Sequence, residues 1–248
     1  MEKIRVSCVA YLNSKPFLKG LQMLEASGSI ELNIEPPKVC AQKLINNEVD
    51  IGLVPVASIP LLPKSIIISK LGIGADGAVG SVMLFSECPL NEISEILLDH
   101  ESMTSVNLCK VLCRDHWKIH PKFTEATSGF EKKIGGTTAG VVIGDRAIEL
   151  RGRYHYELDL PAEWKQMTGL PFIFACWVST MEVDELFLRT FVSALESGLA
   201  QLEDIIQELE QQDTTIGKFA REYFTQKLNY NLSEKHFEGL KLFWNLIR

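Results

Sequence analysis

The stretch IRVSCVAYLNSKPFLKGLQML, residues 4–24, determines how the fold begins. Apolar side chains alternate from Ile4 to Ala10, a pattern that is typical of a β-strand. Apolar residues then recur at helical spacing from Phe17 to Leu24. A polar segment, residues 11–16, separates the two patterns. The sequence therefore predicts a strand that passes through a polar loop into an amphipathic helix.

The polar loop has two explanations. Pro16 suits the first turn of a helix, where its missing N–H is no loss, and Ser14 suits a helix cap. Asn13 is left over, because one helix start needs only one capping side chain. In open α/β sheets, ligands bind outside the carboxyl ends of strands, often at helix N-termini. The loop is thus either a helix cap alone or one wall of a ligand site.

The rest of the chain continues to alternate between strand and helix patterns. We expect a helix at 39–47 and a buried strand within VDIGLVPVASI, residues 49–59. Further strands are expected at 65–69, 79–86, 96–99, 139–144 and 170–179, and helices at 104–116, 145–150, 181–210, 215–228 and 233–247. This alternation predicts an α/β fold with mixed, mostly parallel sheets, flanking helices and a helical C-terminal tail.

Composition and charge exclude several classes of function. A chain of 248 residues with 46% hydrophobic residues can bury a substantial core. The formal net charge of -7 argues against nucleic acid as a partner, because phosphate binding needs a basic patch. There is no apolar run of about 18 residues and no secretory signal pattern before the first strand. We therefore expect a cytoplasmic protein that does not associate with membranes.

The sequence predicts neither a metal nor a cofactor. The six cysteines are scattered and form no CxxC pair, which favours buried free thiols. The five histidines lack the spacing of metal ligands, and P-loop, GxSxG and HExxH motifs are absent from the sequence. The segment GIGADG, residues 72–77, lacks the spacing of a dinucleotide-binding fingerprint.

Small polar side chains recur at the ends of other predicted strands. They are Ser81, Thr104, Ser105 and Asp145. Each has a structural explanation by itself, as a helix cap or as a sheet residue bonded to its own backbone. Because parallel strands end at the same edge of a sheet, these side chains and the first polar loop could also line one pocket.

Six stretches of the chain point together to a known family. They are VAYLNSKPF (9–17), VDIGLVPVASI (49–59), DGAVGSVMLFS (76–86), SMTSVNL (102–108), VVIGDRA (141–147) and WKQMTGLPFIFACW (164–177). In this order they resemble the chorismate dehydratases of the futalosine route to menaquinone. The resemblance implies a two-lobed fold like the type II periplasmic binding proteins. Lobe I would comprise residues 1–87 and 171–248, lobe II residues 88–170, and the substrate would lie in the cleft between them.

The resemblance also implies a reaction and roles for particular residues. The reaction removes water from chorismate to give 3-[(1-carboxyvinyl)oxy]benzoate, without a cofactor. Asn13 and Ser81 match positions that would hydrogen-bond the reacting part of the substrate. The positions that match cleft-lining loops of the family are Ser14, Thr104, Ser105, Gly144 and Asp145.

The sequence departs from the family at one position, and rival functions stay open. The family commonly has arginine where this chain has Met103, so Arg146 or Lys15 would have to supply a cation for the substrate carboxylates. No matched residue is an obvious general base, which leaves a substrate carboxylate as a candidate. The rivals are the sister enzyme that makes 1,4-dihydroxy-6-naphthoate and a non-enzymatic small-anion binding protein. The sister enzyme is expected to carry a Ser-Pro-Cys-Pro-Asn loop, which residues 11–16 do not match.

Overall fold

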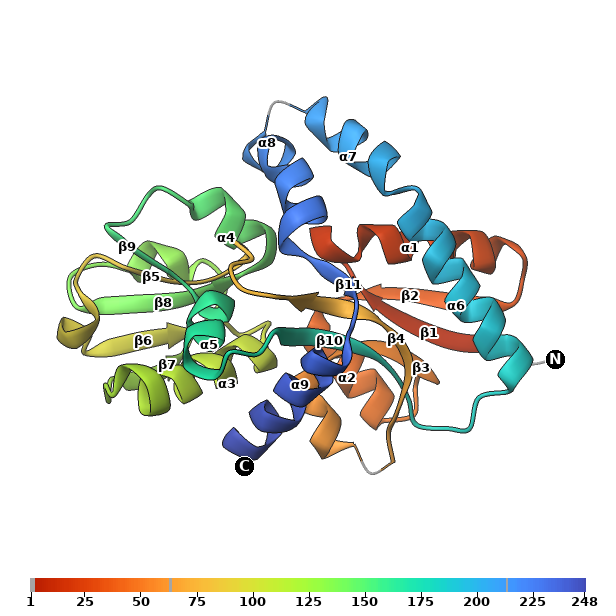
Figure 1. The fold of residues 1–248 in the computed structure, drawn as a ribbon, viewed down its shortest axis with the longest axis horizontal. Coiled ribbons are helices and arrows are strands. Elements are labelled where there is room, and N and C mark those ends of the chain that lie inside the picture. The colour runs from red at the N-terminus through yellow and green to blue at the C-terminus, as the bar shows by residue number, and fades with distance from the viewer. Residues whose placement is uncertain (1–2, 63, 213) are drawn as a thin grey trace.

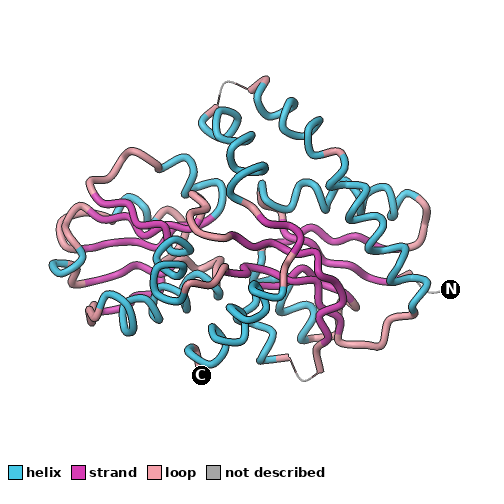
Figure 2. Tube along the Cα trace, in the orientation of Figure 1, coloured by secondary structure: helices cyan, strands magenta, loops and turns pink. Residues whose placement is uncertain are grey.

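Two β-sheets lie side by side and form the centre of the protein (Figure 1). The structure is a computed structural model that describes residues 3–62, 64–212 and 214–248. The strands form two groups that helices flank (Figure 2). The fold is therefore α/β with two lobes, as the sequence predicts.

The first sheet has six strands in the order β11-β4-β10-β3-β1-β2. The strands are β1 (Ile4–Val9), β2 (Ile30–Glu35), β3 (Ile51–Pro55), β4 (Ile66–Ala75), β10 (Phe172–Ser179) and β11 (Asn229–Asn231). β1 pairs in parallel with β2 and β3, whereas β10 pairs antiparallel with β3 and β4. The C-terminal third of the chain thus completes the sheet that the N-terminal third begins.

The second sheet has five strands in the order β7-β6-β8-β5-β9. The strands are β5 (Val82–Ser86), β6 (Glu95–Leu98), β7 (Lys122–Glu125), β8 (Thr138–Ile143) and β9 (Tyr156–Asp159). β6 pairs in parallel with β7 and β8, and β5 pairs antiparallel with β8 and β9. The chain enters this lobe after β4 and leaves it before β10.

The described helices lie around both sheets. They are α1 (Lys15–Ala26), α2 (Pro37–Ile45), α3 (Met103–Val111), α4 (Gly144–Leu150), α5 (Leu160–Thr168), α6 (Glu185–Ala200), α7 (Leu202–Glu210), α8 (Thr215–Glu222) and α9 (Glu234–Leu246). α1 packs against α6, whereas α3, α4 and α5 pack against strands of the second sheet. None of the helices in the described ranges has the length and apolar character needed to cross a membrane.

Two expectations about the sheets need correction. β5 was expected in lobe I, before a boundary at residue 87, but it pairs with β8 and β9 in the second sheet. The chain crosses earlier, through a turn in which Gly77 and Gly80 have positive φ angles of 106° and 78°. The sheets are mixed, as expected, but they are not mostly parallel, because β4 and β5, on either side of this crossing, pair antiparallel in their sheets.

Three strand ends lead directly into helices, and these ends position the site. β1 continues through a short 3₁₀ turn (Leu12–Ser14) into α1, whose first turn contains Pro16. β6 leads into α3 and β8 leads into α4. The predicted succession of strand, polar loop and helix at residues 4–24 is confirmed.

Candidate functional site

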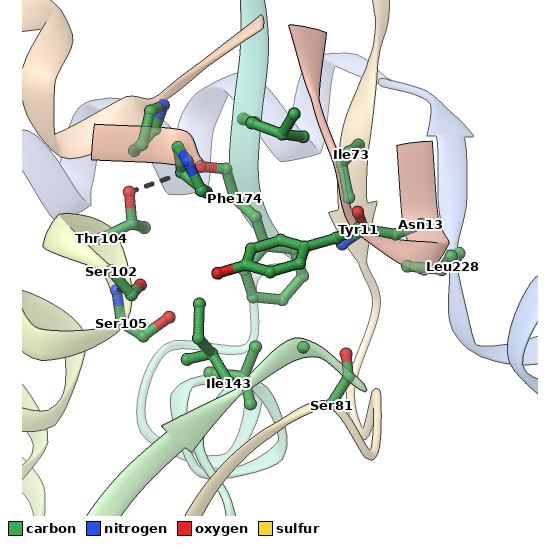
Figure 3. A pocket seen from close by; sticks show the side chains of 16 residues that line it. Tyr11, Asn13, Ile73, Ser81, Ser102, Thr104, Ser105, Ile143, Phe174 and Leu228 are labelled. Atoms are coloured by element: carbon green, nitrogen blue, oxygen red, sulfur yellow. Dashed lines mark hydrogen bonds between the residues drawn. The ribbon is translucent and has the colours of Figure 1, made fainter. Parts of the chain in front are cut away.

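A cavity of about 590 Å³, measured with its mouth, lies between the two sheets (Figure 3). Its walls come from the loop after β1, from β4 and β10 of the first sheet, and from the ends of β6 and β8 of the second. The lining residues are Val9, Tyr11, Asn13, Pro37, Pro55, Ile73, Ser81, Val82, Ser102, Thr104, Ser105, Ile143, Gly144, Phe174, Ala175 and Leu228. A mostly apolar wall with a few polar groups is typical of small-molecule sites.

Asn13, in the turn after β1, and Ser81, directly before β5, line this same cavity. Among the described residues, the Asn13 side-chain oxygen Oδ1 is buried without a hydrogen-bond partner. Buried polar atoms almost always have a partner, so an unpartnered acceptor beside a cavity indicates a place for a ligand donor. The backbone carbonyl of Asn13 accepts a hydrogen bond from the Tyr230 hydroxyl at 2.7 Å, which holds the loop in place.

Ser81 is held by a tyrosine that the sequence did not single out. The Ser81 Oγ lies 2.9 Å from the hydroxyl of Tyr223, which follows α8. The Ser81 carbonyl accepts a hydrogen bond from the Gly144 N–H at 2.8 Å. Both side chains of the Ser81–Tyr223 pair are buried. Ser81 is therefore a fixed hydroxyl at the cavity wall.

The start of α3 contributes three hydroxyls to the cavity wall. Ser102 caps the helix, because its Oγ accepts a hydrogen bond from the Ser105 N–H at 3.0 Å. The Thr104 hydroxyl lies 3.3 Å from the Ala57 N–H and 3.4 Å from the Phe174 carbonyl, so it bridges to the first sheet. The sequence assigned Thr104 and Ser105 to the site but missed Ser102, whose role as the helix cap does not prevent it from lining the cavity.

Gly144 is placed in the cavity by its backbone conformation. Its φ angle is +63°, and a Cβ atom built on it would lie 3.4 Å from the ring of Tyr11. A side chain there would be strained and would press on that ring. Glycine at this position therefore lets the Tyr11 ring lie across the start of α4.

Two predicted site residues do not line the cavity. Ser14 is buried, and its hydroxyl lies 2.6 Å from the Val9 carbonyl and 2.8 Å from the Tyr11 carbonyl. Asp145 accepts the Leu12 N–H at 3.2 Å through its carboxylate. Burial is the main cause that raises the pKa of Asp145. In this structure Ser14 stabilises the loop and Asp145 ties it to the other lobe.

The two cations expected to replace the family's arginine also lie outside the cavity. Arg146 pairs with three carboxylates, those of Asp99 at 2.8 Å, Glu101 at 3.0 Å and Glu131 at 2.5 Å. Lys15 is exposed and belongs to a separate surface depression beside α7. Among the lining residues there is no lysine, arginine or histidine. Carboxylates in the cavity would have to be held by N–H and O–H donors.

Tyr11 spans the two lobes at the cavity. Its ring lines the cavity from the loop after β1, and its hydroxyl donates to the Glu101 carboxylate at 2.6 Å. Burial and the Glu101 carboxylate raise the pKa of Tyr11 well above its usual range. Because Glu101 is also paired with Arg146, this contact joins the loop to a charged cluster of the second lobe.

Comparison with known proteins identifies the family. The family model described as menaquinone biosynthesis matches residues 4–248. The chain belongs to this family. A curated relative, the chorismate dehydratase of Thermus thermophilus, is 26% identical over 242 residues, which cover 90% of this chain and 82% of the relative. The resemblance inferred from the six sequence stretches is thus confirmed.

Several solved structures have a fold similar to that of this menaquinone biosynthesis family member. A protein from Archaeoglobus fulgidus superposes with a TM-score of 0.70 at 16% identity and covers 98% of this chain and 96% of its own. A Candida albicans gene product described as having the generic periplasmic binding protein fold has a TM-score of 0.64 at 14% identity. That match covers 100% of this chain and 90% of the other. The periplasmic-binding-protein-like fold is therefore established.

No group of three or more histidine, cysteine, aspartate or glutamate side chains in the described parts of the chain is arranged to hold a metal ion. The six cysteines are buried and free of disulfides, as expected. In this family member the cavity wall is made of hydroxyl, amide and apolar groups, and its chemistry has to be explained with those.

Proposed function

We propose that this protein is a chorismate dehydratase of the futalosine route to menaquinone and acts in the cytoplasm. One observation carries the proposal. Asn13, whose Oδ1 has no hydrogen-bond partner among the described residues, and the fixed hydroxyl of Ser81 lie in the wall of the same cavity. Membership of the menaquinone biosynthesis family and the Thermus thermophilus relative support the choice of chorismate as substrate.

The proposed reaction is an elimination that makes the substrate ring aromatic. The C4–O bond breaks, C3 loses its hydrogen as a proton, and water leaves, which gives 3-[(1-carboxyvinyl)oxy]benzoate. Aromatisation supplies the driving force, so the protein has to hold the ring and stabilise the departing oxygen. Asn13 and Ser81 are assigned to this oxygen, while Tyr11 and Phe174 contribute apolar surface to the ring site.

The substrate carboxylates would be received by donors at the start of α3. Ser102, Thr104 and Ser105 line the cavity there, and the first N–H groups of a helix attract anions. This arrangement accounts for carboxylate binding although Met103 replaces the family's arginine and Arg146 is paired elsewhere.

The substrate itself would supply the base. Within the described ranges, no aspartate, glutamate, histidine or lysine lines the cavity. The carboxylate of the enolpyruvyl group is attached next to C3, so it can reach the C3 proton without any protein side chain.

The decisive experiment mixes the purified protein with chorismate, without added metal or cofactor, and identifies the product by mass and ultraviolet absorbance. We expect an aromatic product lighter by one water, and no reaction with an analogue that lacks the enolpyruvyl carboxylate. Reaction of the analogue at a normal rate would overturn the assignment of the base. Unchanged chorismate in the presence of folded protein would favour the small-anion binding protein or the sister enzyme that makes 1,4-dihydroxy-6-naphthoate.

A further inference from the structure

Asp159 lies at the junction of β9 and α5, and its carboxylate accepts three backbone N–H groups. Oδ1 accepts the Ala162 N–H at 3.1 Å, which caps α5. Oδ2 accepts the N–H groups of Val79 and Gly80 at 2.9 and 2.6 Å. These two residues belong to the crossing between the lobes and come directly before Ser81. The side chain therefore does more than cap a helix, because it also ties the crossing to the second lobe.

The backbone of the crossing presents two successive N–H groups to one carboxylate oxygen. Gly80 has a φ angle of +78°, and a Cβ atom built on it would lie 2.9 Å from the Phe219 ring, so this conformation requires glycine. Successive N–H groups in such turns form a concavity that binds an anion. Val79 and Gly80 are buried, where an N–H group without an acceptor costs free energy. The Asp159 carboxylate thus supplies the acceptor that the crossing needs.

Ser81 follows this attachment and is fixed from its other side as well. Its carbonyl accepts the Gly144 N–H at 2.8 Å, and the next residue, Val82, pairs with Ile143 in the second sheet. The Ser81 side chain lies in the cavity wall (Figure 3). Its place is therefore set by two attachments of the backbone to the second lobe, one before it through Asp159 and one after it through β8.

We propose that Asp159 is a positioning residue, which fixes through the N–H groups of Val79 and Gly80 where the Ser81 hydroxyl meets the departing oxygen. Asp159 itself does not line the cavity, so it acts on the reaction only through Ser81. Displacement of a reacting group by about 1 Å can cost about 100-fold in rate. Binding of a ring that lacks the departing oxygen does not depend on this placement. The inference rests on the proposed function.

Two substitutions separate this role from that of a helix cap. Serine and asparagine cap helices about as well as aspartate. Serine is too short to reach the crossing as well, whereas the oxygen of asparagine can turn toward the two N–H groups there. We expect kcat for chorismate to fall roughly 10- to 100-fold in Asp159→Ser and clearly less in Asp159→Asn. The dissociation constant of the benzoate product, which lacks the C4 hydroxyl, should change less than about twofold in both variants.

Asp184→Ser is the matched control. Asp184 caps α6 by accepting the N–H groups of Leu186 and Phe187 at 3.0 and 3.1 Å, and it is exposed and does not line the cavity. Its substitution should leave kcat within about twofold of the wild type, because serine replaces the cap and no attachment of the crossing is lost.

Three results would overturn the role of Asp159. They are a wild-type kcat in Asp159→Ser, equal losses of kcat in Asp159→Ser and Asp159→Asn, and a product affinity that weakens as far as kcat falls. If Asp159→Ser does not fold, Asp159→Glu takes its place, since it keeps both oxygens but moves them by one methylene group. Its kcat should again fall while product affinity is kept, and a kcat within about twofold of the wild type would overturn the role.

Amide hydrogen exchange distinguishes a failure of this inference from a failure of the proposed function. A wild-type protein that leaves chorismate unchanged would refute the proposed function. Exchange at Val79 and Gly80 should still be at least about tenfold faster in Asp159→Ser than in the wild type, because both N–H groups lose their acceptor. Exchange at Ala162 should change little, since serine caps α5. Unchanged exchange at Val79 and Gly80 would overturn the role of Asp159.

Discussion

Ser81→Ala and Asn13→Ala should each lower kcat for chorismate by roughly 100- to 1000-fold, the usual effect of removing a donor or acceptor from a developing charge. The structure explains why folding should survive. Ser81→Ala loses one hydrogen bond to Tyr223, worth about 1 kcal/mol, and Asn13→Ala breaks no hydrogen bond to Oδ1, because that atom has no donor among the described residues. The melting temperature should therefore fall by only a few degrees.

Ser86→Ala provides the matched control for these variants. Ser86 is also buried, lies five residues further along the same segment, and donates its hydroxyl to the Cys88 carbonyl at 2.8 Å, away from the cavity. Steady-state kinetics and thermal unfolding of all three variants separate a site role from a structural role. If Ser81→Ala or Asn13→Ala retained the kcat of Ser86→Ala, or failed to fold, the site assignment would be wrong at that residue.

Gly198→Ala should destabilise the protein by about 3 kcal/mol or more. α1 and α6 cross with their backbones in contact, and a Cβ atom on Gly198 would lie 1.9 Å from the Pro16 carbonyl oxygen. On the facing helix, a Cβ atom on Gly20 would lie 1.9 Å from the Ala194 carbonyl oxygen. Because the obstacle is backbone, the helices have to separate. Alanine would otherwise stabilise a helix by about 1 kcal/mol relative to glycine, so the expected loss has the opposite sign to helix propensity.

The loss at Gly198 is measured as a change in melting temperature. For a chain of this size, about 3 kcal/mol corresponds to a decrease of roughly 6 to 12 °C. Gly135→Ala is the control, because a Cβ atom there meets nothing within 4 Å and its φ angle is not positive. A melting temperature of Gly198→Ala equal to or above that of Gly135→Ala would contradict the close crossing of α1 and α6.

The sequence predicts those parts of the fold in which local pattern and burial agree. β1 and α1 have strong apolar periodicities and lie close to their predicted positions. β2, β7 and β9 were not predicted, because they expose part of their residues at or near sheet edges and lack a continuous apolar run. The sheet to which β5 belongs could not be predicted either, since a buried apolar strand reads the same in either lobe.

In the candidate site too, local sequence patterns predict some residues, whereas contacts between residues far apart in the sequence could not be predicted. Asn13, Ser81, Thr104, Ser105 and Gly144 line the cavity, because polar groups at strand ends converge in an α/β sheet. Ser14 and Asp145 fit the same pattern, but their side chains hydrogen-bond backbone groups and do not line the cavity. Tyr223 lies 142 positions from Ser81, in a helical segment where an aromatic residue indicates only a buried face.

A crystal structure of the wild-type protein with 3-[(1-carboxyvinyl)oxy]benzoate would test most directly whether the cavity between the sheets is the site of the reaction. The account predicts density for the product in the cavity, with the C4 edge of the ring facing Asn13 and Ser81 and a carboxylate at the start of α3. Product bound elsewhere, or bound with its C4 edge turned away from Asn13 and Ser81, would contradict it.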